Sequence, residues 1–169
     1  DEIANKANKD PYEFRRDMLS GTKDIHLLDA VADKIDWYRK TENFHKGIAV
    51  VDSYGSYTAA AVELSVKNKK IEVKKVVVAI NPGYVVNPDA VKAQIESGVI
   101  WGLSAFMHEE ITINDGKVNE SNFNDYPILK LSETPEIIPL ILPSGGFWGG
   151  VGEPPIGAVI PALANAIFK

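Results

Sequence analysis

One stretch of the chain is unusually rich in glycine: Ser144-Gly-Gly-Phe-Trp-Gly-Gly-Val-Gly-Glu-Pro-Pro155. Glycine has no Cβ to shield its backbone, so a run of glycines exposes N–H groups that can wrap around a ligand. Pro154 and Pro155 fix the backbone torsion φ at a value that suits the start of a helix. The run from Ala158 to Phe168 is almost wholly apolar. We therefore expect a buried helix directly after the glycine-rich loop.

Glu153 is the only charged residue between Ser144 and Phe168. A carboxylate held between glycines and a buried helix would lose its hydration, which disfavours the charged form. A general base that works near neutral pH needs that environment. The residues alone leave two interpretations open. Glu153 is either a catalytic base or an ordinary solvated side chain in a surface turn.

The composition excludes several classes of site. The chain has 169 residues, of which 45% are hydrophobic, and a net charge of −5. This length fits one domain or part of a larger one, and the interspersed charges do not suggest a nucleic-acid partner or an anionic membrane. With no cysteine there is no disulfide, thiolate metal site or iron–sulfur ligand. His26, His45 and His108 lack metal-ligand spacing, so we predict no metal ligand in this chain, and no run is long and apolar enough to span a membrane.

Upstream of the loop, local patterns predict helices followed by strands. Residues 1–43 are predicted to form a helical lead-in, in which Asp10-Pro11 opens one helix and Asp24 caps the next. Alternating apolar residues then predict three strands, at residues 46–54, 57–66 and 71–80, joined by short turns. We expect these strands to form an antiparallel meander.

A long helix is predicted from Asn87-Pro88 to about His108, because the pair supplies an N-cap and a proline at the first helical position. Gly98 and Gly102 lie four residues apart on one face of it, and Gln94 lies on the same stripe. A glycine inside a helix costs ~1 kcal/mol relative to alanine, so we expect something to pack very close to this face. A neighbouring strand or helix is the simplest candidate.

Two further elements complete the predicted fold. Asp115-Gly116 is a strong signal for a β-hairpin turn, and residues 136–142 predict a last strand that leads into the glycine-rich loop. The predicted fold class is α+β, with helices packed on an antiparallel sheet.

Several stretches resemble the molybdenum hydroxylases, the xanthine dehydrogenase and aldehyde oxidase superfamily, in particular the large subunit of the isoquinoline 1-oxidoreductase type. Gly150-Val-Gly-Glu-Pro-Pro155 resembles the C-terminal signature of that family. Gln94-Ile-Glu-Ser-Gly-Val-Ile-Trp-Gly-Leu-Ser104 resembles the family's Q-x-E-G-x-x-x-Q-G-L-G segment. The chain departs from this pattern at three positions: Ser97 and Ser104 stand for glycine, and Trp101 stands for glutamine.

The resemblance implies that residues 1–169 are the C-terminal portion of a molybdopterin-binding domain. It implies that Glu153 is the catalytic base beside the molybdenum and that Gln94 contacts the pterin. The backbone amides of Gly150, Val151 and Gly152 would face the oxygen ligands of the metal. The reaction implied is hydroxylation of a carbon in an N-heteroaromatic or aldehyde substrate with oxygen from water.

The resemblance also implies a cofactor and partners. The cofactor would be molybdopterin with molybdenum, in a dinucleotide form, shared with the missing half of the subunit. Iron–sulfur clusters would lie on a partner domain or subunit, and a cytochrome or flavin subunit would be a further partner. Residue 1 is Asp and the chain opens inside a predicted helix, so we expect a fragment of a longer protein, either periplasmic or cytoplasmic.

Two other functions stay open. The chain by itself could be a catalytically silent structural domain that packs against the rest of the subunit. It could also be an unrelated hydrolase that uses Glu153, although no second carboxylate or nucleophile has suggestive spacing.

Overall fold

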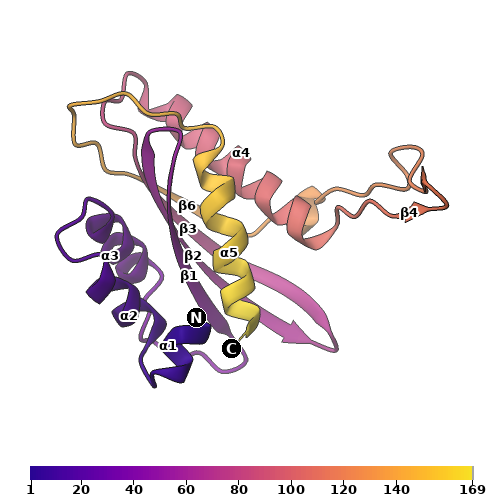
Figure 1. Cartoon of the computed structure of the whole chain (residues 1–169), viewed down its shortest axis with the longest axis horizontal. Coiled ribbons are helices and arrows are strands. Elements are labelled where there is room, and N and C mark those ends of the chain that lie inside the picture. The colour runs from indigo at the N-terminus through magenta and orange to yellow at the C-terminus, as the bar shows by residue number, and fades with distance from the viewer. Residues whose placement is uncertain (169) are drawn as a thin grey trace.

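A computed structural model describes residues 1–168 and has a four-stranded sheet at its centre, in the order β1-β2-β3-β6 (Figure 1). Its strands are β1 (His45–Ser53), β2 (Ser56–Lys67), β3 (Lys70–Asn81) and β6 (Glu136–Ile141). The first three pair antiparallel, which confirms the predicted meander. The predicted last strand joins β3 in parallel instead. This pairing makes the sheet mixed, because the chain crosses back over the sheet before β6 begins.

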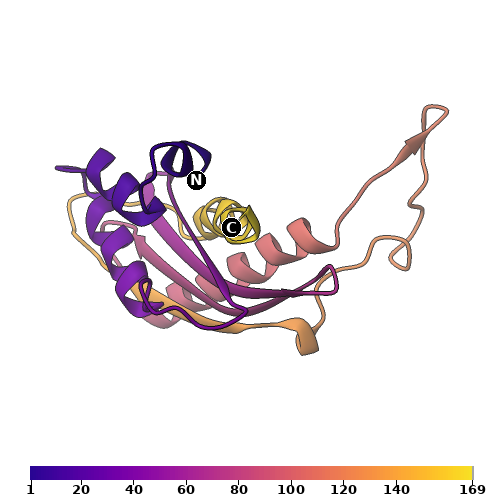
Figure 2. The ribbon, with the colours of Figure 1, turned by 90° about the horizontal axis from the view of Figure 1, so that it is seen from below.

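Helices cover both faces of the sheet (Figures 1 and 2). They are α1 (Glu2–Lys6), α2 (Pro11–Met18), α3 (Asp24–Lys34), α4 (Pro88–Met107) and α5 (Pro154–Phe168). The α3 helix packs on one face, and α4 and α5 pack on the other. This layering confirms the predicted α+β class.

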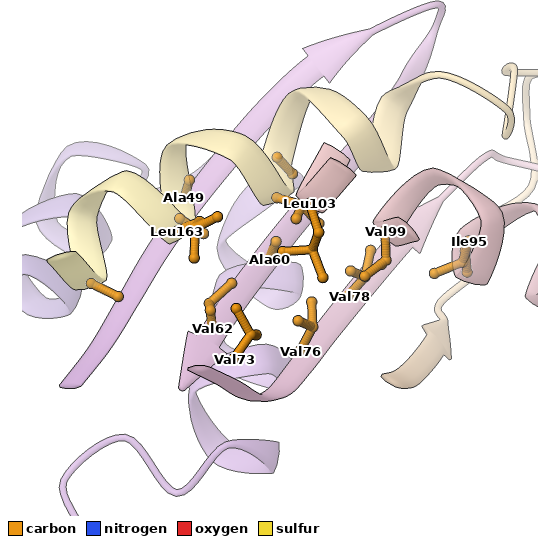
Figure 3. Packing of buried hydrophobic residues seen from close by; sticks show 14 of the residues in the cluster. Ala49, Ala60, Val62, Val73, Val76, Val78, Ile95, Val99, Leu103 and Leu163 are labelled. Carbon is orange, nitrogen blue, oxygen red and sulfur yellow. The ribbon is translucent and has the colours of Figure 1, made fainter. Parts of the chain in front are cut away.

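The two cores follow from the period of the strands, since successive side chains point to opposite faces of a sheet. In β2, Ala59 and Ala61 pack under α3. Ala60 and Val62 pack under α4 and α5, where Figure 3 shows them beside Val99, Leu103 and Leu163. The small alanines let the helices approach the sheet closely on both sides.

Two predicted helix N-caps are confirmed and one is wrong. The side chain of Asp10 accepts from the N–H of Tyr12, and that of Asn87 accepts from the N–H of Asp89. Asp24, in contrast, is the first residue of α3 and makes no capping bond. Its Oδ1 is buried without a hydrogen-bond partner among residues 1–168, and burial, followed by the charge of Asp52, raises the pKa of this carboxyl.

The glycine face of α4 is filled by α5, as the simplest explanation predicts. A Cβ built at Gly98 would lie 2.8 Å from the Cβ of Pro155, and one at Gly102 would lie 3.5 Å from the side chain of Val159. The α5 helix itself is buried on one face only. Pro161 and Phe168 are exposed on the other, so the predicted burial of this helix holds for one face.

A long arm leaves the end of α4 and projects away from the sheet (Figures 1 and 2). It carries the predicted hairpin, formed by β4 (Ile113–Asn114) and β5 (Lys117–Val118). Both turn residues, Asp115 and Gly116, have positive φ, as this hairpin turn requires. The arm returns through a short 3₁₀ helix, Leu131–Glu133. None of the helices in residues 1–168 combines the length and the apolar character needed to cross a bilayer.

Candidate functional site

The glycine-rich loop crosses one end of the sheet between β6 and α5. The N–H of Gly145 donates to the carbonyl of Gly83 and the N–H of Gly149 to that of Pro82, each at 2.9 Å. The N–H of Tyr84 donates to the carbonyl of Phe147 at 3.0 Å. The loop is thus tied to the segment that follows β3, and its course is set by backbone hydrogen bonds.

A buried asparagine holds the same two segments together. Asn81, at the end of β3, is 6% exposed. Its Oδ1 accepts from the N–H of Gly83 at 3.0 Å and from the N–H of Ser144 at 3.2 Å, and its Nδ2 donates to Ser144 Oγ at 3.1 Å. The amide side chain of Asn81 therefore bonds both to the segment that follows β3 and to the start of the glycine-rich loop.

The later glycines turn past the hairpin between β1 and β2. The N–H of Gly150 donates to the carbonyl of Tyr54 at 2.9 Å, and Ser56 Oγ donates to the carbonyl of Gly150 at 2.6 Å. Since the amide of Gly150 is used within the chain, it is not free to face a ligand, contrary to what the resemblance implies. The amides of Val151 and Gly152 meet no acceptor of the chain within residues 1–168.

Gln94 and Gly152 lie side by side, although they come from different segments. A Cβ built at Gly152 would be 3.6 Å from Gln94 Oε1. Their approach follows from the packing of α5 on the glycine face of α4, since the carbonyl of Gly152 would be 3.3 Å from a Cβ at Gly98. Gln94 is exposed and can reach outward.

Glu153 is exposed, and its carboxylate makes no hydrogen bond or ion pair within residues 1–168. The burial that we expected around this carboxylate is therefore not supplied by this chain. Glu153 directly precedes α5, so the positive end of the helix dipole lies beside it. An exposed, unpaired carboxylate at this position is free to meet a ligand from outside.

These groups fit a cofactor that is held by hydrogen bonds. Gln94 is exposed, and the amides of the half-buried Val151 and Gly152 meet no acceptor within residues 1–168, so all three can donate hydrogen bonds to a ligand. Among the described residues, 1–168, no group of three or more His, Asp and Glu side chains could hold a metal ion.

Sequence reasoning missed three aromatic residues: Trp148 in the loop, and Tyr54 and Tyr84, which contact it. They come from three separate segments, so no local pattern groups them. The only sequence signal is that each stands within two residues of a glycine.

The sequence model of a protein family, the molybdopterin cofactor-binding domain, matches residues 2–135 of the chain. The beta subunit of isoquinoline 1-oxidoreductase from Brevundimonas diminuta is 33% identical over the whole of this chain, which spans 22% of that subunit. The membrane-bound aldehyde dehydrogenase of Gluconacetobacter polyoxogenes is 28% identical, also over the whole chain, which spans 25% of it.

Among solved structures, quinoline 2-oxidoreductase from Pseudomonas putida 86 has a similar fold. It superposes with a TM-score of 0.62 at 21% identity and covers 66% of this chain, which spans 15% of that protein chain. The chain thus corresponds to about a quarter or less of each of these proteins.

Proposed function

Because this chain belongs to the molybdopterin cofactor-binding domain family of the molybdenum hydroxylases, we propose that it forms one side of the active site of a hydroxylase. The reaction would add oxygen from water to a carbon of an N-heteroaromatic or aldehyde substrate, with Glu153 as the base. When bound, the molybdenum cofactor would supply the redox chemistry of this reaction.

In this proposal the carboxylate of Glu153 accepts a proton from the water-derived hydroxyl group that attacks the substrate. The carboxylate is exposed and unpaired within residues 1–168, so it carries no competing structural role. Closure of the site by the rest of the subunit would exclude water from the surroundings of Glu153.

Gln94 and the two free amides would hold the cofactor. The amides of Val151 and Gly152 lie just before α5 and meet no acceptor within residues 1–168, so they could donate to oxygen ligands that carry negative charge. Gln94 lies against Gly152 and would donate to the pterin. The observation that carries the proposal is that tertiary packing brings Gln94 beside Gly152, the residue that precedes Glu153.

We expect Glu153→Gln in the complete enzyme to lower turnover by about 10²- to 10⁴-fold, as loss of a general base does. The amide keeps the shape of the side chain but cannot accept the proton. Molybdenum content, measured by mass spectrometry, should stay unchanged, because Glu153 is not proposed to hold the cofactor.

Glu72→Gln is a matched control, since Glu72 is an exposed glutamate on β3, and it should leave turnover unaltered. Near-normal turnover in Glu153→Gln would show that Glu153 is not the base.

The second candidate is that the chain by itself is a catalytically silent structural domain of the subunit. The exposure of both Glu153 and Gln94 favours it, because an active site needs walls that this chain does not supply. Molybdenum analysis of the chain, expressed with and without the remainder of the subunit, separates the two functions.

A further inference from the structure

The turn between β1 and β2 lies against the later glycines of the loop. Tyr54 and Gly55 form this turn, with φ of 52° and 73°, and Ser56 opens β2 directly after it. A Cβ built at Gly149 would lie 2.1 Å from Ser56 Oγ and 2.5 Å from the carbonyl oxygen of Gly55. The loop therefore passes so close to the turn that only a residue without a side chain fits at Gly149.

The turn holds both backbone polar groups of Gly150. Ser56 is fully buried, with 0% of its surface exposed, and its Oγ donates to the carbonyl of Gly150 at 2.6 Å. The N–H of Gly150 donates to the carbonyl of Tyr54 at 2.9 Å. One of these two bonds therefore depends on a side chain, that of Ser56.

The bond from Ser56 also fixes the direction of the next N–H group. The carbonyl of Gly150 and the N–H of Val151 belong to one planar trans peptide unit, so the two groups point in opposite directions. Since the carbonyl faces the turn, the N–H of Val151 faces away from it. That N–H meets no acceptor within residues 1–168, and in the proposed function it helps to hold the cofactor.

No other side chain within residues 1–168 bonds to this peptide unit. Gly150 has no Cβ, so it permits a wide range of backbone torsions. It is also exposed, so its carbonyl could turn toward water if Ser56 Oγ were removed. The side chain of Val151 packs against the buried cluster under α4 and α5, which fixes the position of that residue rather than the plane of the peptide before it.

We propose that Ser56 is a positioning residue, which orients the Gly150–Val151 peptide so that the N–H of Val151 can donate to a negatively charged oxygen of the cofactor. This inference rests on the proposed function, because it explains how one of the cofactor-holding amides is aimed. Ser56 acts through Gly150 and does not reach a ligand itself, since it is fully buried.

The test measures how long the complete enzyme keeps its molybdenum. After gel filtration and dilution, we expect Ser56→Ala to lose molybdenum about tenfold faster than the unmodified enzyme, the effect of one hydrogen bond to a charged group. Mass spectrometry follows the molybdenum content with time. Ser56→Cys keeps a weaker donor at the same place and should restore part of the retention.

Two further variants separate positioning from a general loss of stability. Thr58→Ala removes another fully buried hydroxyl group from β2, one that makes no hydrogen bond within residues 1–168, so it should retain molybdenum as the unmodified enzyme does. Asn81→Ala frees the start of the loop but leaves the bond from Ser56 to Gly150 in place. It should therefore lower Tm while speeding the loss of molybdenum less than Ser56→Ala does.

A second readout does not depend on bound molybdenum. In a crystal structure of the cofactor-free Ser56→Ala enzyme, the carbonyl of Gly150 should turn from the β1–β2 turn toward solvent. The N–H of Val151 should change direction with it, because both groups belong to one rigid unit.

Unchanged molybdenum retention in Ser56→Ala, or a Gly150 carbonyl that keeps its direction in that variant, would overturn the inference. Equally fast loss from Asn81→Ala would also overturn it, because anchoring of the loop as a whole would then explain the effect. Failure of the proposed function gives a different pattern: Glu153→Gln would turn over at the normal rate while Ser56→Ala still lost molybdenum faster.

Discussion

Gln94 is placed to hold a cofactor and not to move a proton, because its amide lies against Gly152 and has no acid–base role. We expect Gln94→Ala to lower the molybdenum occupancy of the complete enzyme more than the activity per bound molybdenum. Occupancy is measured by mass spectrometry and activity by initial rates on the same samples. Glu96→Ala, at an exposed position on the same helix, should change neither.

The opposite result would assign Gln94 to the chemistry. If occupancy stayed constant and the activity per molybdenum were lost, the residue would have to act on the substrate or on the proton transferred.

Asn81 is the residue on which the position of the glycine-rich loop most depends. Removal of its side chain in Asn81→Ala leaves the N–H groups of Gly83 and Ser144 without their acceptor. Of these two donors only the N–H of Gly83 is buried, and a buried donor left unpaired costs about 1–3 kcal/mol. We therefore expect a loss of about 1–3 kcal/mol in the free energy of unfolding, measured in urea.

Asn81→Asp is the matched variant, because a carboxylate can accept from the same two N–H groups and from Ser144 Oγ. It should retain more of the stability than Asn81→Ala does. Equal destabilisation by both variants would mean that shape and not hydrogen bonding is what the loop requires from Asn81.

At the scale of elements, the contact between α4 and α5 decides where the candidate site forms. Gly98 allows the start of α5 to approach, since a Cβ there would lie 2.8 Å from the Cβ of Pro155, which cannot swing away. A Cβ at Gly102 would be at ordinary contact distance, 3.5 Å, from Val159. The two glycines therefore make a natural comparison within one helix.

We expect Gly98→Ala to destabilise the chain by about 1–2 kcal/mol, since overpacking costs more than the helix propensity of alanine returns. Gly102→Ala should be neutral or stabilising by up to about 1 kcal/mol, because only the propensity changes. Urea unfolding followed by circular dichroism measures both. Similar effects at the two positions would argue that the helices can separate freely.

At the scale of the whole molecule, the open side of the candidate site predicts the behaviour of the isolated chain. The sheet and its two buried clusters should fold cooperatively. With Glu153 and Gln94 both exposed, we expect the isolated chain to bind no molybdopterin and to show no hydroxylase activity. Metal analysis by mass spectrometry checks this, with the complete subunit as the control.

Stoichiometric molybdenum in the isolated chain would contradict this prediction, because the site would then be complete without further walls.

The projecting arm adds a second expectation. Phe123 and Leu131 are 92% and 91% exposed, so the isolated chain should self-associate as its concentration rises, which analytical ultracentrifugation detects.

The local signals of the sequence determined most of the elements. Asn87 predicts the start of α4 because its side chain satisfies the first free amides of the same helix. Asp115 and Gly116 predict the hairpin because their turn needs two residues at positive φ. Such signals act between neighbours in the chain, so they can be interpreted without knowledge of the fold. The resemblance likewise grouped Gln94 with Glu153, and their roles stay predictions.

The tertiary structure alone decided which residues surround the candidate site. The local sequence predicts a cap at Asp24, but the structure buries its carboxyl near Asp52 and leaves it without a capping bond. Tyr54 stands beside the glycine-rich loop only because the chain crosses the sheet through α4, returns as β6 and then passes the hairpin between β1 and β2. Contacts between such distant segments depend on that crossover. The pattern of residues along any one segment does not predict the crossover, so it does not predict these contacts.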